Sequence, residues 1–176
     1  MNENVFRRVE QKYLLTPTES EQLMKKIEDY IECDEYFEST ICNIYFDNNH
    51  NDLIVASLEK PTFKVKIRLR SYNIPDLPDK VFLEIKDKYR GIVGKRRIKM
   101  TLKDFYDYLN TGSFNDKQIM KEIDYYFKKY NLKPYAFVAY DRKSYRGRLD
   151  KFLRITFDRN LRSRYEDLRL ELGDAG

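Results

Sequence analysis

Residues 63–70 carry the clearest chemical pattern in the sequence, because large apolar residues alternate there with cations: Phe-Lys-Val-Lys-Ile-Arg-Leu-Arg. Alternate residues of a strand point to opposite sides of a sheet, so one side would join the core and the other would carry four positive charges. Cations about 7 Å apart on one side repel by roughly 2 kcal/mol at an effective dielectric of 20. A solvent-facing strand is the alternative for this segment taken alone. A side with cations only is nevertheless expected to bind an anion.

Other segments add carboxylates and further cations to this pattern. A Glu-x-Lys spacing, which places both side chains on one side of a strand, occurs at Glu10 and Lys12 and again at Glu84 and Lys86. Each occurrence alone also fits an ordinary ion pair. Later arginines include Arg142, Arg146, Arg154, Arg159, Arg162 and Arg164. Guanidinium groups suit planar contact with phosphate oxygens, and carboxylates suit a hard divalent cation. Together the residues predict a site for a polyphosphate and its metal.

The charge is distributed unevenly along the 176 residues. The chain has 34 Lys and Arg against 29 Asp and Glu, a net charge of +5. Residues 60–100 hold 13 basic and 4 acidic residues, and residues 133–164 hold 10 and 3, so these stretches carry +9 and +7. The rest holds 11 basic and 22 acidic residues, a net charge of −11. The basic and acidic parts of the chain are therefore expected to have different roles.

Hydrophobic periodicity assigns the basic stretches to strands and much of the acidic remainder to helices. Strands are predicted at 5–15, 40–47, 62–72, 81–90, 92–100, 134–147 and 151–159, with a last one at 161–172. Helices are predicted at 19–31, capped by Thr18, and at 51–58, 102–109 and 117–130. Short connections imply antiparallel pairing. We expect an α+β fold with an antiparallel β-barrel and peripheral helices, an open sheet being the alternative.

An ordered set of motifs then suggests a family. The motifs are Arg8-Val9-Glu10-Gln11-Lys12-Tyr13, Tyr45-Phe46-Asp47, Lys66-x-Arg68-x-Arg70, Phe82-Leu83-Glu84-Ile85-Lys86, Tyr140-x-Arg142 and residues 152–158. In this order they resemble the polyphosphate polymerase domain of the vacuolar transporter chaperone (VTC) family, one of the CYTH-like triphosphate tunnel enzymes. The resemblance runs from about residue 6 to residue 164. It implies a tunnel-shaped barrel that binds ATP and polyphosphate and transfers the γ-phosphate of ATP, using a divalent metal, Mn²⁺ or Mg²⁺.

The resemblance also implies roles for individual residues. The resemblance assigns phosphate binding and catalysis to Lys12, Arg68, Arg70 and Lys86. It assigns further phosphate binding to Arg142 and Arg154. Glu84 and Glu10 become metal ligands or ion-pair partners of the lysines. Arg97, Arg146 and Arg164 are candidates of second rank. The family pattern continues with another Glu-x-Lys strand beyond residue 176, so we expect residues 1–176 to form one tunnel domain without its C-terminal strand, and its metal-dependent turnover to be in doubt.

Three classes of function follow from these expectations. The first is a polyphosphate polymerase, or a triphosphatase that uses the same tunnel. The second is a module that binds polyphosphate without turnover. The third is RNA binding, which we rank last because the cations alternate with core residues on strands instead of forming a flexible basic arm. No apolar run approaches the roughly 20 residues of a membrane span, and the start of the chain is not a secretory signal, so we expect a cytoplasmic protein.

Overall fold

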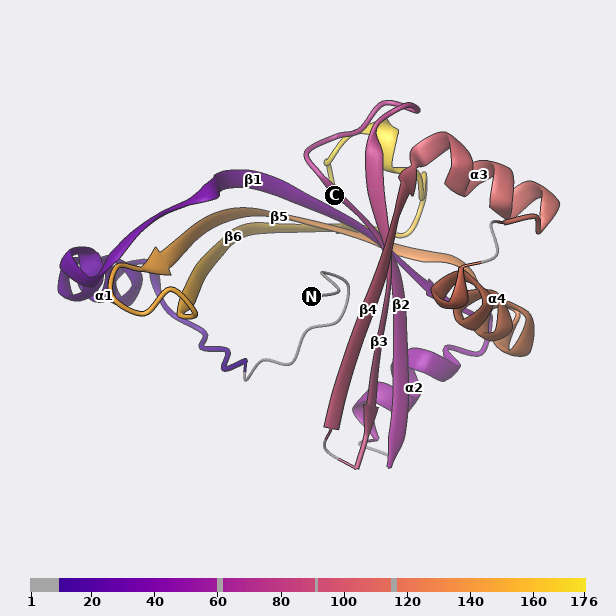
Figure 1. Cartoon of the computed structure of the whole chain (residues 1–176), viewed down its shortest axis with the longest axis horizontal. Coiled ribbons are helices and arrows are strands. Elements are labelled where there is room, and N and C mark those ends of the chain that lie inside the picture. The colour runs from indigo at the N-terminus through magenta and orange to yellow at the C-terminus, as the bar shows by residue number, and fades with distance from the viewer. Residues whose placement is uncertain (1–9, 60–61, 91, 115–116) are drawn as a thin grey trace.

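The computed structural model describes residues 10–59, 62–90, 92–114 and 117–176. Six strands within them form one antiparallel sheet in the order β4-β3-β2-β1-β5-β6 (Figure 1). The strands are β1 (Ile31–Asp47), β2 (Phe63–Tyr72), β3 (Lys80–Tyr89), β4 (Ile92–Thr101), β5 (Lys133–Gly147) and β6 (Arg154–Arg164). The helices are α1 (Pro17–Ile27), α2 (Asp52–Leu58), α3 (Leu102–Thr111) and α4 (Gln118–Tyr130), with 3-10 turns η1 (Glu28–Tyr30) and η2 (Leu170–Leu172). The predicted α+β class, antiparallel sheet and peripheral helices are confirmed. Within the described residues the sheet stays open between β4 and β6.

The core lies on one side of β2 and β3, where the apolar residues of the alternating pattern point. Ile67 and Leu69 of β2 and Leu83 of β3 are completely buried. Phe105 of α3 and Ile123 of α4 belong to the same apolar cluster. Both helices cover this side of the sheet in Figure 1, so the cations of β2 must point to the other side.

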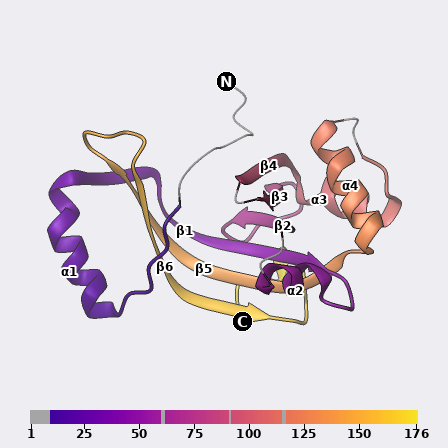
Figure 2. The same ribbon diagram turned by 90° about the horizontal axis from the view of Figure 1, so that it is seen from below.

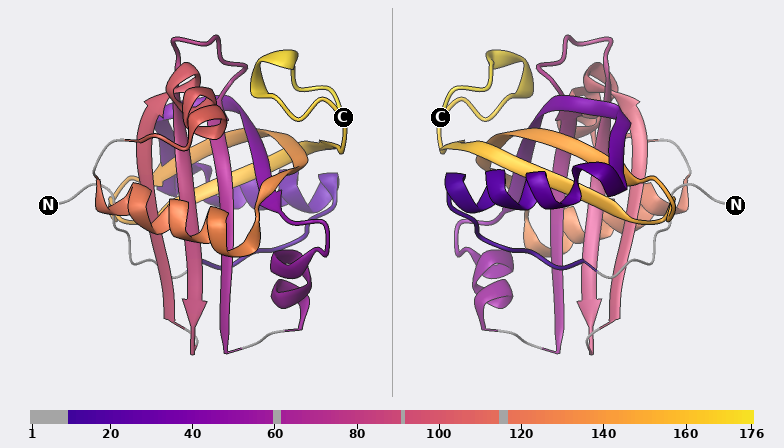
Figure 3. Two further views of the ribbon diagram at one scale, coloured as in Figure 1. Left: turned by 90° about the vertical axis from the view of Figure 1, so that its right-hand side faces the viewer. Right: turned by 90° about the vertical axis from the view of Figure 1, so that its left-hand side faces the viewer.

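Strands β1, β5 and β6 bend away from β2–β4 and form an arch (Figures 1 and 2). The pairing of β1 with β5 shifts register between Cys33 and Glu38, and the pairing of β5 with β6 shifts between Ala139 and Asp141. Such bulges increase the local bend and twist of a strand. Figure 3 shows the result, with β5 and β6 crossing the direction of β2–β4 and α1 lying over their far end.

Local signals explain where α3 begins and ends. Thr101 and Asp104 exchange hydrogen bonds as a capping box at its N-terminus, and Gly112 ends it with a φ of +68°, a left-handed conformation that favours glycine. The longest described helix, α4, has 13 residues. In the described part of the chain, no helix has the length and apolar character needed to cross a membrane.

Several predicted elements differ from the structure. Helix α1 is capped by Thr16, whose hydroxyl accepts from the Glu19 amide, and not by Thr18. The helix stops at Ile27, and β1 already begins at Ile31, because pairing with β5 overrides the mixed local pattern of residues 31–39. Residues 161–164 belong to β6, so the separate strand predicted at 161–172 is wrong. Of the strand predicted at 5–15, residues 10–15 have no regular structure and the rest lie outside the described residues.

Candidate functional site

Three of the four cations of β2 lie in rows that run across β2, β3 and β4 on the side of the sheet opposite α3 and α4. The strand pairing places Lys66, Lys86 and Lys95 in the first row; Tyr45, Arg68, Glu84 and Arg97 in the second; and Asn43, Arg70, Phe82 and Lys99 in the third. We call the side chains of these three rows the cationic face. It contains seven cations and one carboxylate. Like charges that lie directly opposite each other destabilise a sheet, so the first row in particular favours nearby anions.

Glu84 is the electrostatic centre of the cationic face. Its side chain is only 2% exposed, and Oε2 lies 2.6 Å from one terminal nitrogen of Arg68 and accepts from its Nε at 2.8 Å. Lys95 Nζ lies 3.0 Å from the other oxygen, Oε1. Burial alone would raise the pKa of Glu84, but the charges of Arg68, Arg70 and Lys95 outweigh it and lower this pKa to about 2. Glu84 is therefore ionised at neutral pH and holds cations from two strands together.

Arg70 is held by neutral partners instead of a carboxylate. Its Nε donates to Asn43 Oδ1 at 2.9 Å, and a terminal nitrogen donates to the Tyr140 hydroxyl at 3.2 Å. Asn43 is itself completely buried and donates to the Val138 carbonyl oxygen at 3.0 Å. The guanidinium is thus fixed in direction, and among the described residues it makes no direct ion pair with a carboxylate. A fixed cation without a direct carboxylate partner is suited to binding an anion.

The second row contains a further polar contact to Arg68. One of its terminal nitrogens donates to the Tyr45 hydroxyl at 3.2 Å. Burial would raise the pKa of Tyr45, but the nearby charge and hydrogen bond of Arg68 lower it. Arg68 therefore has a carboxylate on one flank and a phenol on the other, and its orientation is strongly restrained.

Strand β5 extends the same side of the sheet toward the arch. Arg142 lies two residues beyond Tyr140 and makes two parallel hydrogen bonds to Asp158 of β6, both 2.7 Å long. Arg154 follows farther along β6 and lies 3.0 Å from Asp34. Both predicted phosphate-binding arginines therefore reach the same side as Arg70, but each has a carboxylate partner that an incoming anion would have to displace.

The N-terminal segment adds the remaining predicted site residues. Glu10 lies 3.5 Å from Lys86 Nζ, so the segment lies next to the first row. Lys12 is 3.8 Å from the same carboxylate, and its side chain is 80% exposed. The structure thus connects Lys12 to the cationic face only through Glu10, in the part of the chain that is described.

The candidates of second rank separate into different environments. Arg97 belongs to the cationic face, where its guanidinium lies over the Phe82 ring at 4.7 Å. Arg146 pairs with Glu32 at 2.9 Å near the end of the arch. Arg164 donates to backbone carbonyl groups of the C-terminal segment, including those of residues 169 and 173. Of these three, Arg97 alone has a position that suits phosphate binding.

Some residues of the cationic face were not predicted from the sequence. Lys95 and Lys99 lie in one predicted strand, and Asn43 and Tyr45 lie in another. Only the pairing register shows which side of the sheet these side chains occupy. The sequence of β4 weakly indicates that its cations share one side of the sheet, since Lys95, Arg97 and Lys99 occupy every second position. No comparable signal marks Asn43, which is an isolated polar residue in an apolar strand.

The described residues do not fit a resident divalent metal ion. Glu84 has cations against both carboxylate oxygens, and Glu10 contacts two lysines. No group of three or more His, Cys, Asp or Glu side chains in the described residues lies close enough to hold a metal. A divalent ion needs hard oxygen ligands, and here cations already occupy these carboxylates. The arrangement therefore gives no support to the metal-ligand role of Glu84 and Glu10, which stays a prediction.

Comparison with known proteins gives an independent view of the chain. The family model of the VTC domain matches residues 7–175. The chain is 27% identical over 154 residues to vacuolar transporter chaperone complex subunit 4 of Schizosaccharomyces pombe, covering 74% of this chain. It spans about a fifth of the length of that relative, 21%.

The fold also resembles a solved structure. A crystal structure of a Bacillus halodurans protein, provisionally assigned as an adenylate cyclase, superposes with a TM-score of 0.60. The match covers 93% of this chain and 76% of that one, at 13% sequence identity. This likeness concerns the fold alone.

Proposed function

The chain belongs to the VTC domain family of the CYTH-like triphosphate tunnel superfamily, and from this premise we propose that its cationic face binds inorganic polyphosphate and the triphosphate of ATP. The observation that carries the proposal is the row formed by Lys66, Lys86 and Lys95. The carboxylates that contact these lysines, Glu10 and Glu84, are shared with Lys12 and Arg68. The row therefore keeps an excess of positive charge, which a chain of phosphates would neutralise.

We propose different phosphate-binding roles for the cations, because their side chains are restrained to different degrees. Arg68 and Arg70 have fixed orientations and would bind phosphate oxygens directionally, as guanidinium groups do. The lysines of the first row would neutralise charge along the chain without strict geometry. Arg142, Arg154 and Lys12 would engage phosphates farther along, after the arginines release their carboxylates.

We further propose that the family's reaction, transfer of the γ-phosphate of ATP to polyphosphate, takes place on this face. Phosphoryl transfer depends on aligning the reacting oxygens and on neutralising the charge of a loose transition state, and the fixed guanidinium groups supply both. A divalent ion would enter as part of the phosphate substrate, because the described carboxylates are already engaged with cations. The same observation favours a second candidate, a module that binds polyphosphate without turnover.

Binding is tested by titrating tripolyphosphate into the wild-type chain and two triple variants. Changing Lys66, Lys86 and Lys95 to Gln should weaken binding by roughly a hundred-fold or more, since each bond to a charged group is worth about 1.5–3 kcal/mol. The matched control changes Lys26, Lys103 and Lys128, which are exposed and lie away from the face, and should bind nearly as the wild type does. The first variant also loses the ion pair between Lys95 and the buried Glu84, so a melting curve must show that it is folded before its affinity is compared.

The alternatives are separated by two further measurements. An RNA oligomer of equal charge should bind more weakly than tripolyphosphate, and the reverse order would contradict the proposal. Incubation with ATP and Mn²⁺ should give long-chain polyphosphate together with ADP. Release of inorganic phosphate alone would favour a triphosphatase, and tight binding with no product would favour the non-catalytic module.

A further inference from the structure

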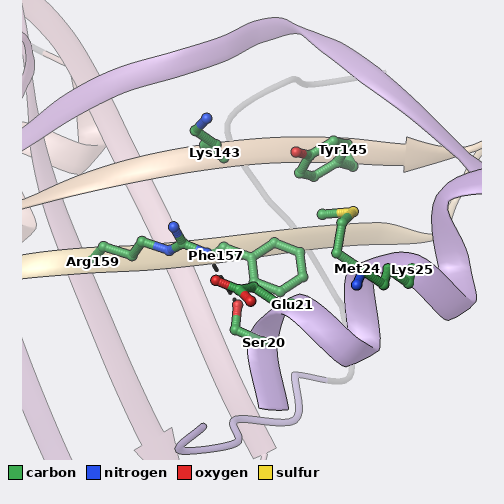
Figure 4. Close-up of a pocket in the computed structure, with 8 residues that line it drawn as sticks. All are labelled: Ser20, Glu21, Met24, Lys25, Lys143, Tyr145, Phe157 and Arg159. Carbon is green, nitrogen blue, oxygen red and sulfur yellow. Dashed lines mark hydrogen bonds between the residues drawn. The ribbon is translucent and has the colours of Figure 1, made fainter. Parts of the chain in front are cut away.

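A second hollow lies on the opposite side of β5 and β6, between these strands and helix α1 (Figure 4). Its volume is about 340 Å³, near the lower end of the roughly 300–1,000 Å³ of typical small-molecule sites. Lys143 and Tyr145 of β5 line it, whereas Arg142 and Ser144 alternate with them and point to the other side. The hollow is therefore separate from the cationic face.

Helix α1 forms the hollow because it packs loosely on the sheet. Ser20 is the one buried residue of the helix, and Met24 and Ile27 are half-buried. Leu23, on the same apolar stripe, stays exposed. A helix that buries so little apolar surface gains little free energy from the sheet, so a ligand placed beneath it could add to its stability.

One end of the hollow is apolar and aromatic. Tyr145 and Phe157 stand edge to face, with ring centroids 6.0 Å apart and planes at 89°. Met24 approaches them from α1, as Figure 4 shows. Two perpendicular rings and a thioether form a surface against which a further flat ring can pack, since aromatic and sulfur–aromatic contacts both favour it.

The other end is cationic. Arg159 donates to the Ser20 hydroxyl at 3.2 Å and has no carboxylate within ion-pair distance in the described part of the chain. Lys143 is nearer to this end and is paired with Glu38 at 2.7 Å, whereas Lys25 lies beside Met24 at the aromatic end and has no acidic partner among the described residues (Figure 4). Glu21 supplies the single negative charge of the lining. The lining as a whole contains three cations and one carboxylate, an excess of positive charge that favours an anion.

From this combination we propose that the hollow binds a small planar aromatic anion, with its ring against Tyr145 and Phe157 and its carboxylate or phosphate group toward Arg159. This inference goes beyond the proposed phosphate chemistry and does not depend on it. The ligand would connect α1 to the sheet, so its binding should also raise the melting temperature of the protein.

The probe for this proposal is 2-naphthoate, titrated by calorimetry into the full chain. We expect saturable one-to-one binding, which Arg159→Gln weakens about ten-fold or more, the usual effect of losing a bond to a charged group. The neutral 2-naphthamide should bind correspondingly more weakly. Lys128→Gln removes an exposed cation from α4 and should leave the affinity unchanged.

A second variant separates lost contacts from lost folding. Phe157→Leu keeps an apolar residue in β6 and should preserve the melting temperature while weakening 2-naphthoate binding. A saturating concentration of tripolyphosphate should leave the affinity for 2-naphthoate within about two-fold. The proposal is overturned if binding does not saturate, if Arg159→Gln binds as tightly as the wild type, or if tripolyphosphate displaces the probe.

Discussion

Replacement of Glu84 by Gln should destabilise the free protein and at the same time strengthen its binding of phosphate anions. The carboxylate holds Arg68 of β2 and Lys95 of β4 together in a buried position. The amide keeps the shape of the side chain but leaves these cations without their counter-charge. It also removes the one negative charge of the cationic face, so tripolyphosphate should bind more tightly.

The size of the effect follows from the pKa of Glu84, which the neighbouring cations lower from 4.5 to about 2 despite burial. One pKa unit corresponds to about 1.4 kcal/mol, so the ionised carboxylate contributes on the order of 3 kcal/mol to stability at neutral pH. For a chain of this size the variant should melt roughly 6–12 °C earlier. Because the folded-state pKa is the lower one, this contribution is present above pH 4.5 and is lost as the pH falls toward 2.

The assay is thermal unfolding of the wild type and Glu84→Gln between pH 3 and 7, with and without tripolyphosphate. The difference in melting temperature should shrink toward low pH, and tripolyphosphate should raise the melting temperature of the variant more than that of the wild type. Glu35→Gln, an exposed change in β1, is the control and should have little effect. Equal stability of wild type and Glu84→Gln at pH 7, or loss of the tripolyphosphate effect in the variant, would refute the reasoning.

Two more substitutions test the neighbouring contacts. Asn43→Ala should lower the free energy of unfolding by about 1–3 kcal/mol in chemical denaturation, because it leaves Arg70 Nε and the Val138 carbonyl group without their buried partner; a fully stable variant would show that the contact is dispensable. Arg142→Gln should change stability by less than about 1 kcal/mol, since its pair with Asp158 is partly exposed, yet should weaken tripolyphosphate binding several-fold; unchanged affinity would exclude Arg142 from the site.

The strands of the cationic face were predictable because their sequence alternates cleanly. Burial of every second residue in β2 leaves a single arrangement in which Lys66, Arg68 and Arg70 share the other side. The same pattern in β3 places Glu84 and Lys86 beside them. Local periodicity and the final packing agree in these two strands, so the sequence was sufficient to predict that these residues share one side of the sheet.

Other features depend on contacts between distant segments and could not be predicted locally. The first half of β1 has a mixed pattern and becomes a strand through its pairing with β5. The role of Asn43 depends on Arg70, 27 residues away, and on a carbonyl group of β5. The hollow beneath α1 arises from the loose packing of that helix on β5 and β6, which no short segment encodes.

The most direct test of the central claim is a crystal structure of the chain grown with tripolyphosphate. We predict phosphate density along the row of Lys66, Lys86 and Lys95, with oxygen atoms within hydrogen-bond distance of Arg68 or Arg70. Density on the outer side of β5 and β6, or an empty cationic face in crystals that hold tripolyphosphate elsewhere, would contradict the account.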